Sequence, residues 1–80
     1  SDPVEVINEM CLLYFPKGAS PTEKATLKYI LTNGLPDFEW TLQYNEYMSN
    51  MSDPTYSDPV RVRLESVMFQ MFQMPEFQTI

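Results

Sequence analysis

Residues 59–77 read Pro-Val-Arg-Val-Arg-Leu-Glu-Ser-Val-Met-Phe-Gln-Met-Phe-Gln-Met-Pro-Glu-Phe, a pattern typical of one long apolar helix. At 100° per residue, a single face of this helix collects Val60, Leu64, Val67, Met68, Met71 and Met74. Pro75 should end the helix, because proline lacks an N–H and disfavours helical geometry at the residue before it. We therefore predict a helix over residues 59–74 that the rest of the chain covers.

The apolar surface of this helix is wider than one packed face requires. Val62 and Phe69 fall on the side that should meet water, and Phe72 lies on the flank. A helix that is apolar around most of its circumference is normally buried on more than one side. Because 80 residues can hardly surround it, we expect Val62, Phe69 and Phe72 to contact a partner outside this chain. Leu12, on the polar side of the first predicted helix, gives the same indication.

Three helices are predicted upstream from their start and stop signals. Asp2-Pro3, with an acidic residue at position 5, begins a helix over about 3–15. Ser20-Pro21, followed by Glu23, is a capping box for a helix over about 21–33, which Asn33-Gly34 ends. A third helix is expected over about 37–50, followed by a longer polar linker over 50–58. The first helix should turn these residues inward: Val4, Ile7, Met10, Cys11 and Tyr14.

The predicted fold class is therefore all-α, a small bundle of four helices joined by short loops and one longer linker. The third helix carries an aromatic and methionine stripe at helical spacing, formed by Trp40, Tyr44, Tyr47, Met48 and Met51. Such a stripe can pack in the core, or it can form a rigid surface for a protein or glycan, with Tyr56 of the linker beside it. The sequence leaves both interpretations open.

Two Ser-Asp-Pro triplets, at 52–54 and 57–59, lie at the end of the predicted linker. Their carboxylates could be calcium ligands, but the spacing does not match a calcium loop and the linker lacks glycine. Helix capping is the alternative. Because Ser57-Asp58-Pro59-Val60 repeats Ser1-Asp2-Pro3-Val4, we interpret both as helix starts.

Charge and composition exclude several function classes. The net charge is −6, and residues 37–58 contain five acids and no base, which argues against nucleic acid as a partner. No apolar run approaches the roughly 20 residues that span a bilayer, so membrane insertion is not expected. There is no histidine and only one cysteine, so no metal site and no cofactor are predicted. Cys11 is expected to be a buried, inert thiol, with a reactive thiol as the alternative.

No constellation of residues predicts catalysis. Histidine, the commonest general base, is absent, and both glycines lie in predicted turns rather than in a phosphate-binding loop. Glu5 with Glu9, and Glu39 with Glu46, are carboxylate pairs on faces that should be solvated. We do not expect a complete active site within these residues.

The C-terminal segment resembles a known family. Residues 63–72 (Arg-Leu-Glu-Ser-Val-Met-Phe-Gln-Met-Phe) and 74–78 (Met-Pro-Glu-Phe-Gln) are similar to the end of bacterial proteins catalogued as domain of unknown function 1800. The similarity extends over about residues 20–80. It implies that the chain is the C-terminal helical segment of a larger exported bacterial protein, and it implies no reaction. The Pro75-Glu76-Phe77 ending is then a docking feature, or else simply a helix stop.

Two functional hypotheses follow. In the first, the chain is a structural and docking segment, with its partner being the rest of a larger chain or another protein. The absence of an initial methionine agrees with this expectation. In the second, it is a self-sufficient acidic module that binds a protein or glycan through its aromatic rings. The second hypothesis requires those rings, Trp40 above all, to face solvent.

Overall fold

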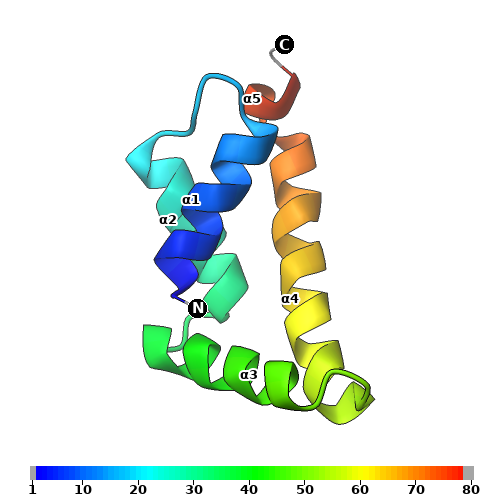
Figure 1. The fold of residues 1–80 in the computed structure, drawn as a ribbon. Helices are drawn as coiled ribbons and strands as arrows, with labels where there is room; N and C mark the ends of the chain where they lie inside the picture. The colour runs from blue at the N-terminus through cyan, green and yellow to red at the C-terminus, as the bar shows by residue number, and fades with distance from the viewer. Residues whose placement is uncertain (1, 79–80) are drawn as a thin grey trace.

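The computed structural model describes residues 2–78, except for the side chains of Glu76 and Gln78. Within this range the chain is all-α, as predicted, with four long helices packed into a bundle and one short terminal helix. The helices are α1 (Pro3–Tyr14), α2 (Pro21–Thr32), α3 (Asp37–Ser49), α4 (Pro54–Gln73) and α5 (Pro75–Gln78). Helices α1, α2 and α4 stand beside one another, and α3 runs across one end of the group (Figure 1).

The predicted signals position the first two helices. The Asp2 carboxylate accepts a hydrogen bond from the Val4 N–H at 2.7 Å, and the Ser20 hydroxyl accepts one from the Glu23 N–H at 3.1 Å. The Glu23 carboxylate accepts from the Ser20 N–H in return, at 2.8 Å, which completes the capping box. At the end of α2, Asn33 adopts a left-handed conformation with φ 56°, where a short polar side chain is tolerated. The first three helices therefore match their predicted bounds to within a residue.

The predicted start of the fourth helix is wrong. Helix α4 begins at Pro54, because Asp53 rather than Asp58 is the N-cap and accepts a hydrogen bond from the Thr55 N–H at 3.0 Å. The long linker predicted over 50–58 is therefore reduced to residues 50–53. Pro59, expected as the first residue, lies inside the helix. Asp58 caps nothing and instead forms an ion pair with Arg61 at 3.4 Å.

The end of α4 agrees with the prediction. The last residue of the helix is Gln73, and Met74 is extended, with φ −80° and ψ 143°. Pro75 then takes the first position of the short helix α5, where its missing N–H costs nothing. Phe77 packs back on the core and stacks on Phe72, with ring centroids 4.8 Å apart. The side chain of Glu76, part of the predicted docking feature, is outside what the structure describes.

The core forms where α2 meets its neighbours. Helix α2 packs against α1, α3 and α4, and its Leu27 and Leu31 are fully buried. The other buried apolar residues come from α1, α3, α4 and the connections that follow α1 and α4: Ile7, Cys11, Phe15, Trp40, Val60, Val67, Met71 and Met74. Val4 was predicted to face inward but is 44% exposed. It lies beside an open cavity between α1 and α2, so α2 does not cover its side chain fully.

Candidate docking surface

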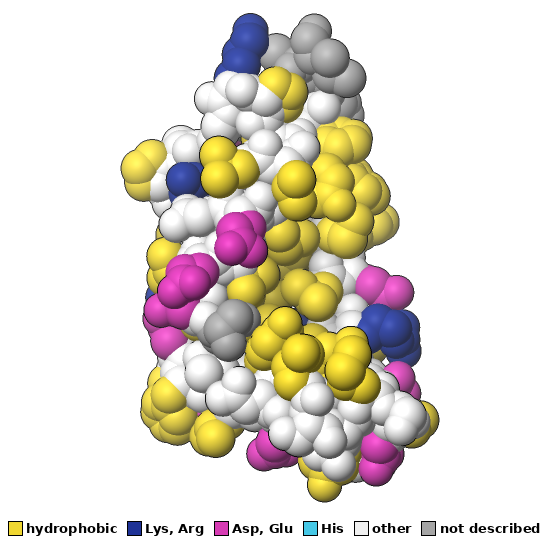
Figure 2. Space-filling view, viewed as in Figure 1, with side chains coloured by type: hydrophobic (Ala, Val, Ile, Leu, Met, Phe, Trp, Pro, Cys, Tyr) yellow, Lys and Arg dark blue, Asp and Glu magenta, His cyan; other side chains and the backbone are white. Residues whose placement is uncertain are grey.

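The outward side of α4 carries large apolar side chains that the bundle does not cover. Val62 is 50% exposed and Phe69 is 68% exposed, and we call these two residues the outer face of α4. They lie seven residues, or about two helical turns, apart on the same side. Apolar atoms gather over α4 on the side of the molecule shown in Figure 2. Phe72, 43% exposed, lies at the edge of this surface, because its ring also meets Tyr14 at 6.4 Å.

Helix α1 adds two further exposed leucines. Leu12 is 83% exposed, as its position on the polar side of the helix indicated, and Leu13 is 76% exposed. Scattered exposed apolar residues are normal, whereas several large ones on a chain of this size indicate a contact surface. The exposed residues of α1 and α4 are therefore the starting point for assigning a function.

The aromatic residues of α3 do not form the open surface that the binding-module hypothesis requires. Trp40 is fully buried, and Tyr44 and Tyr47 are partly buried against the core. The rings form a chain, with centroids 6.0 Å apart for Trp40 and Tyr44 and 6.1 Å apart for Tyr44 and Tyr47. Tyr56, predicted in a linker, lies in the first turn of α4 and is half-buried. Core packing is thus the main role of the three rings, whereas Met48 and Met51 of the same stripe are exposed, and Trp40 cannot contact a partner without leaving the core.

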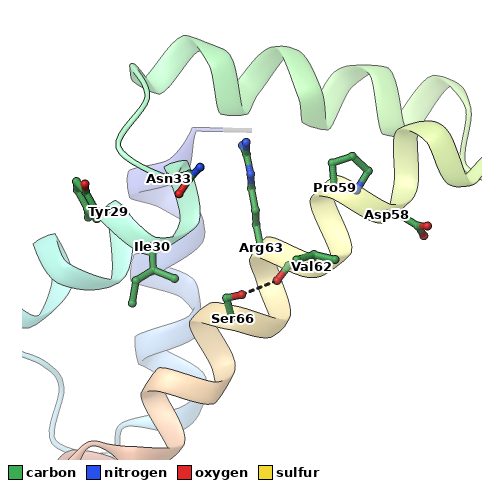
Figure 3. A pocket seen from close by; sticks show the side chains of 8 residues that line it. All are labelled: Tyr29, Ile30, Asn33, Asp58, Pro59, Val62, Arg63 and Ser66. Carbon is green, nitrogen blue, oxygen red and sulfur yellow. Dashed lines mark hydrogen bonds between the residues drawn. The ribbon is translucent and has the colours of Figure 1, made fainter.

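The structure does not bring the two groups of predicted site residues together. Val62 lines a cavity of about 560 Å³ on the side of α4 that faces α2 (Figure 3). Tyr47 lines a different cavity, on the side of α4 that faces α3. A surface that includes both groups would have to wrap around α4. They are therefore separate candidates.

The cavity beside Val62 does not have the features of a ligand site. Arg63 extends through it from α4 toward α3, and Asn33 lies beside it (Figure 3). The Arg63 Nη1 is buried and has no hydrogen-bond partner among the described residues. Asp58, the one acid lining the cavity, is bonded to Arg61, and Ser66 donates to the Val62 carbonyl at 2.9 Å.

Residues with catalytic or metal-binding chemistry do not converge in the described part of the chain. There, no three His, Cys, Asp or Glu side chains are grouped so that they could hold a metal ion. The Asp53 carboxylate, considered as a calcium ligand, is used as a helix cap. Cys11 is buried, and this burial raises the pKa of its thiol, with a smaller opposing effect of the Lys24 charge. A thiol held protonated in this way is a poor nucleophile.

Sequence reasoning overlooked a second apolar side of α1. Val6, Met10 and Leu13 follow one another at i, i+4 and i+7, next to the buried stripe formed by Ile7 and Cys11. Val6 and Met10 are partly buried, and Leu13 is exposed. The signal was present in the sequence, since the apolar residues of this helix cover a wider arc than one packed face needs.

The comparisons with known proteins do not assign the chain to a family. No protein-family model, curated protein or solved structure matches it. In the part of the chain that the structure describes, no helix has both the length and the apolar character needed to cross a membrane.

Proposed function

We propose that this chain is a helical structural and docking segment of a larger exported bacterial protein, and that the outer face of α4 is covered by the rest of that protein. The observation that carries the proposal is the exposure of Phe69, at 68%, in a helix whose opposite side is held in the core by Val60, Val67 and Met71. The helix is fixed in position, so Phe69 and Val62 are held rigidly, with the exposed Ser66 between them and Val62 at the edge that borders α2.

The size of the exposed groups supports a contact rather than chance exposure. Full burial of a Phe or Val side chain contributes about 1.5–3 kcal/mol. Phe69 and Val62 together would therefore contribute about 2–4 kcal/mol to an interface, because each is already partly covered by its own helix. Central apolar and aromatic residues of this kind supply much of the binding energy in protein interfaces.

The resemblance of residues 63–78 to the C-terminal end of the domain of unknown function 1800 family supports the rest of the proposal. It is the basis for the larger parent protein and for the exported location. Phe77, in the closing motif of that resemblance, packs on Phe72 and so keeps α5 against the end of α4. The motif thus helps to shape the end of the proposed docking surface.

The proposal is tested on protein purified from its native source. Intact mass spectrometry combined with light scattering should show either a parent chain larger than 9.4 kDa or a tight complex that contains this chain. A native 9.4 kDa monomer that unfolds cooperatively would refute the proposal, because nothing would then cover the outer face of α4.

A further inference from the structure

Helices α1 and α4 are separated by a groove. Both helices pack against α2 and α3, but they barely contact each other. In Figure 1 they stand apart over most of their length, and Figure 2 shows a hollow lined with apolar atoms at this place.

Apolar side chains form part of the groove, and charged side chains border it. Two cavities, of about 260 and 280 Å³, meet at Leu64 of α4, which lines both. Val6 of α1 and the rings of Trp40 and Tyr44 complete the first cavity. Tyr47 and Met68 are among the residues that complete the second. The first cavity lies between α1, α3 and α4, and the second lies between α3 and α4; we call the two together the α1–α4 groove.

The dimensions of the groove suit a short helix. Its α1 wall has 12 residues, which corresponds to a length of about 18 Å at 1.5 Å per residue. Helix α3 bounds one end, and the edge contact between Tyr14 and Phe72 bounds the other. Helices pack at axial distances of about 8–10 Å, so one helix can touch two neighbours that do not touch each other. Helix-in-groove binding of this kind uses apolar side chains at i, i+3, i+4 and i+7.

The charges beside the groove specify the polar side of its ligand. Glu5 and Glu9, one turn apart on α1, both line the groove and have no ion-pair partner among the described residues. Arg61 is the one base among the lining residues, and it is already bonded to Glu65 at 2.9 Å and to Asp58 at 3.4 Å. The groove therefore presents unpaired negative charge along its α1 edge.

We propose that the α1–α4 groove binds an amphipathic helix that has lysine or arginine beside its apolar stripe. The apolar stripe would lie between Val6 and Leu64, and the basic side chains would reach Glu5 and Glu9. This surface is distinct from the outer face of α4, so the proposal goes beyond the proposed function and does not depend on it. Failure of one of the two leaves the other in place.

The probe for the test is a synthetic helical peptide of about 12 residues made of leucine and lysine, with leucine at i, i+3, i+4 and i+7. The control peptide has glutamate in place of every lysine. Trp40 is the single tryptophan of the chain, and its fully buried ring borders the first cavity, so a helix docked in the groove should change the surroundings of the ring and hence its fluorescence without contacting it directly. The lysine peptide should bind and change this fluorescence, and the glutamate peptide should bind at least tenfold more weakly.

Matched variants of the protein show whether the charges act as proposed. Glu9→Lys should weaken binding of the lysine peptide about five- to tenfold, because an exposed attraction becomes a repulsion. Glu46→Lys makes the same change of net charge at a residue of α3 that does not line the groove, and should change binding less than twofold. Glu9 and Glu46 are both exposed, so both variants should remain folded, which circular dichroism checks.

Three results would overturn the proposal. The first is equal binding of the lysine and glutamate peptides, and the second is the absence of any change in Trp40 fluorescence with either peptide. The third is equal weakening by Glu9→Lys and Glu46→Lys, which would show only a general effect of net charge. Self-association of the chain without peptide, measured by sedimentation and blocked when the peptide is added, would instead assign the groove to a second copy of the chain.

Discussion

Replacing Pro59 with alanine should stabilise the protein. Pro59 is the sixth residue of α4, well beyond the first turn, where proline is accommodated without loss. It has no N–H to donate to the carbonyl of Thr55, four residues earlier, and its ring crowds that carbonyl. Pro59 is itself exposed, so alanine would remove little packing. The native state should therefore gain a helical hydrogen bond at almost no cost in buried surface.

The expected size of the effect follows from three contributions. Proline in a helix interior is about 3 kcal/mol less favourable than alanine. Alanine increases the conformational entropy of the unfolded chain, which offsets about 0.4–1 kcal/mol of the gain. Thr55 is exposed, so water already satisfies its carbonyl in part. The net stabilisation should be about 2 kcal/mol, which raises the melting temperature of a domain this small by roughly 10 °C.

Urea and thermal unfolding followed by circular dichroism measure this change, and Pro54→Ala is the matched control. Pro54 is the first residue of the same helix, so its missing N–H is not needed there. The free energy of unfolding of the control should decrease by up to about 1 kcal/mol, because alanine only increases the conformational entropy of the unfolded chain. A Pro59→Ala variant that is no more stable than the wild type would refute this account of α4.

Other substitutions test the capping and burial that the structure shows. Asp53→Ala should lower the free energy of unfolding by about 1 kcal/mol, because Asp53 caps α4. Asp58→Ala should lower it by about half of this or less, because Asp58 forms only an exposed ion pair, although the two acids stand in identical triplets. Equal decreases in urea unfolding would contradict the assigned start of α4. Burial raises the pKa of Cys11, so this thiol should react with a thiol reagent far more slowly in the folded protein than in urea. As the pH rises, the Cys11 thiol ionises in the unfolded chain before it does so in the folded protein, so the free energy of unfolding should decrease above the ordinary thiol pKa of 9.0. The decrease should be larger in the wild type than in Cys11→Ala, and an equal decrease in both would contradict this assignment.

The sequence predicted the fold class because the first two helices have local capping signals that the structure uses, and the third begins directly after Pro36 without a side-chain cap. It could not predict the start of α4, because Ser52-Asp53-Pro54 and Ser57-Asp58-Pro59 carry the same signal. The longer helix includes Tyr56 and Ser57, which are half-buried. Partial burial of these residues favours the extra turn although Pro59 then lies inside the helix, and packing between helices cannot be read from a local motif.

Only some of the candidate site residues could be placed from the sequence, again because packing between helices is not a local property. Helical spacing was sufficient to place Val62 and Phe69 on the outer side of α4, since the opposite side carries the buried residues. The same spacing could not decide whether Trp40 faces the core or solvent, because α3 crosses one end of the bundle and its orientation depends on the other helices. The α1–α4 groove was not predictable, since it exists only because these two helices do not pack together.

The central claim is that the outer face of α4 is covered in the native protein. Hydroxyl-radical footprinting with mass spectrometry tests it at Phe69, and Phe38 of α3, which is 60% exposed, is an internal control. In the isolated chain of 80 residues, both rings should be oxidised readily. In material from the native source, the account predicts that Phe69 is protected and Phe38 is not. Equal oxidation of Phe69 in the native protein and in the isolated chain would contradict it.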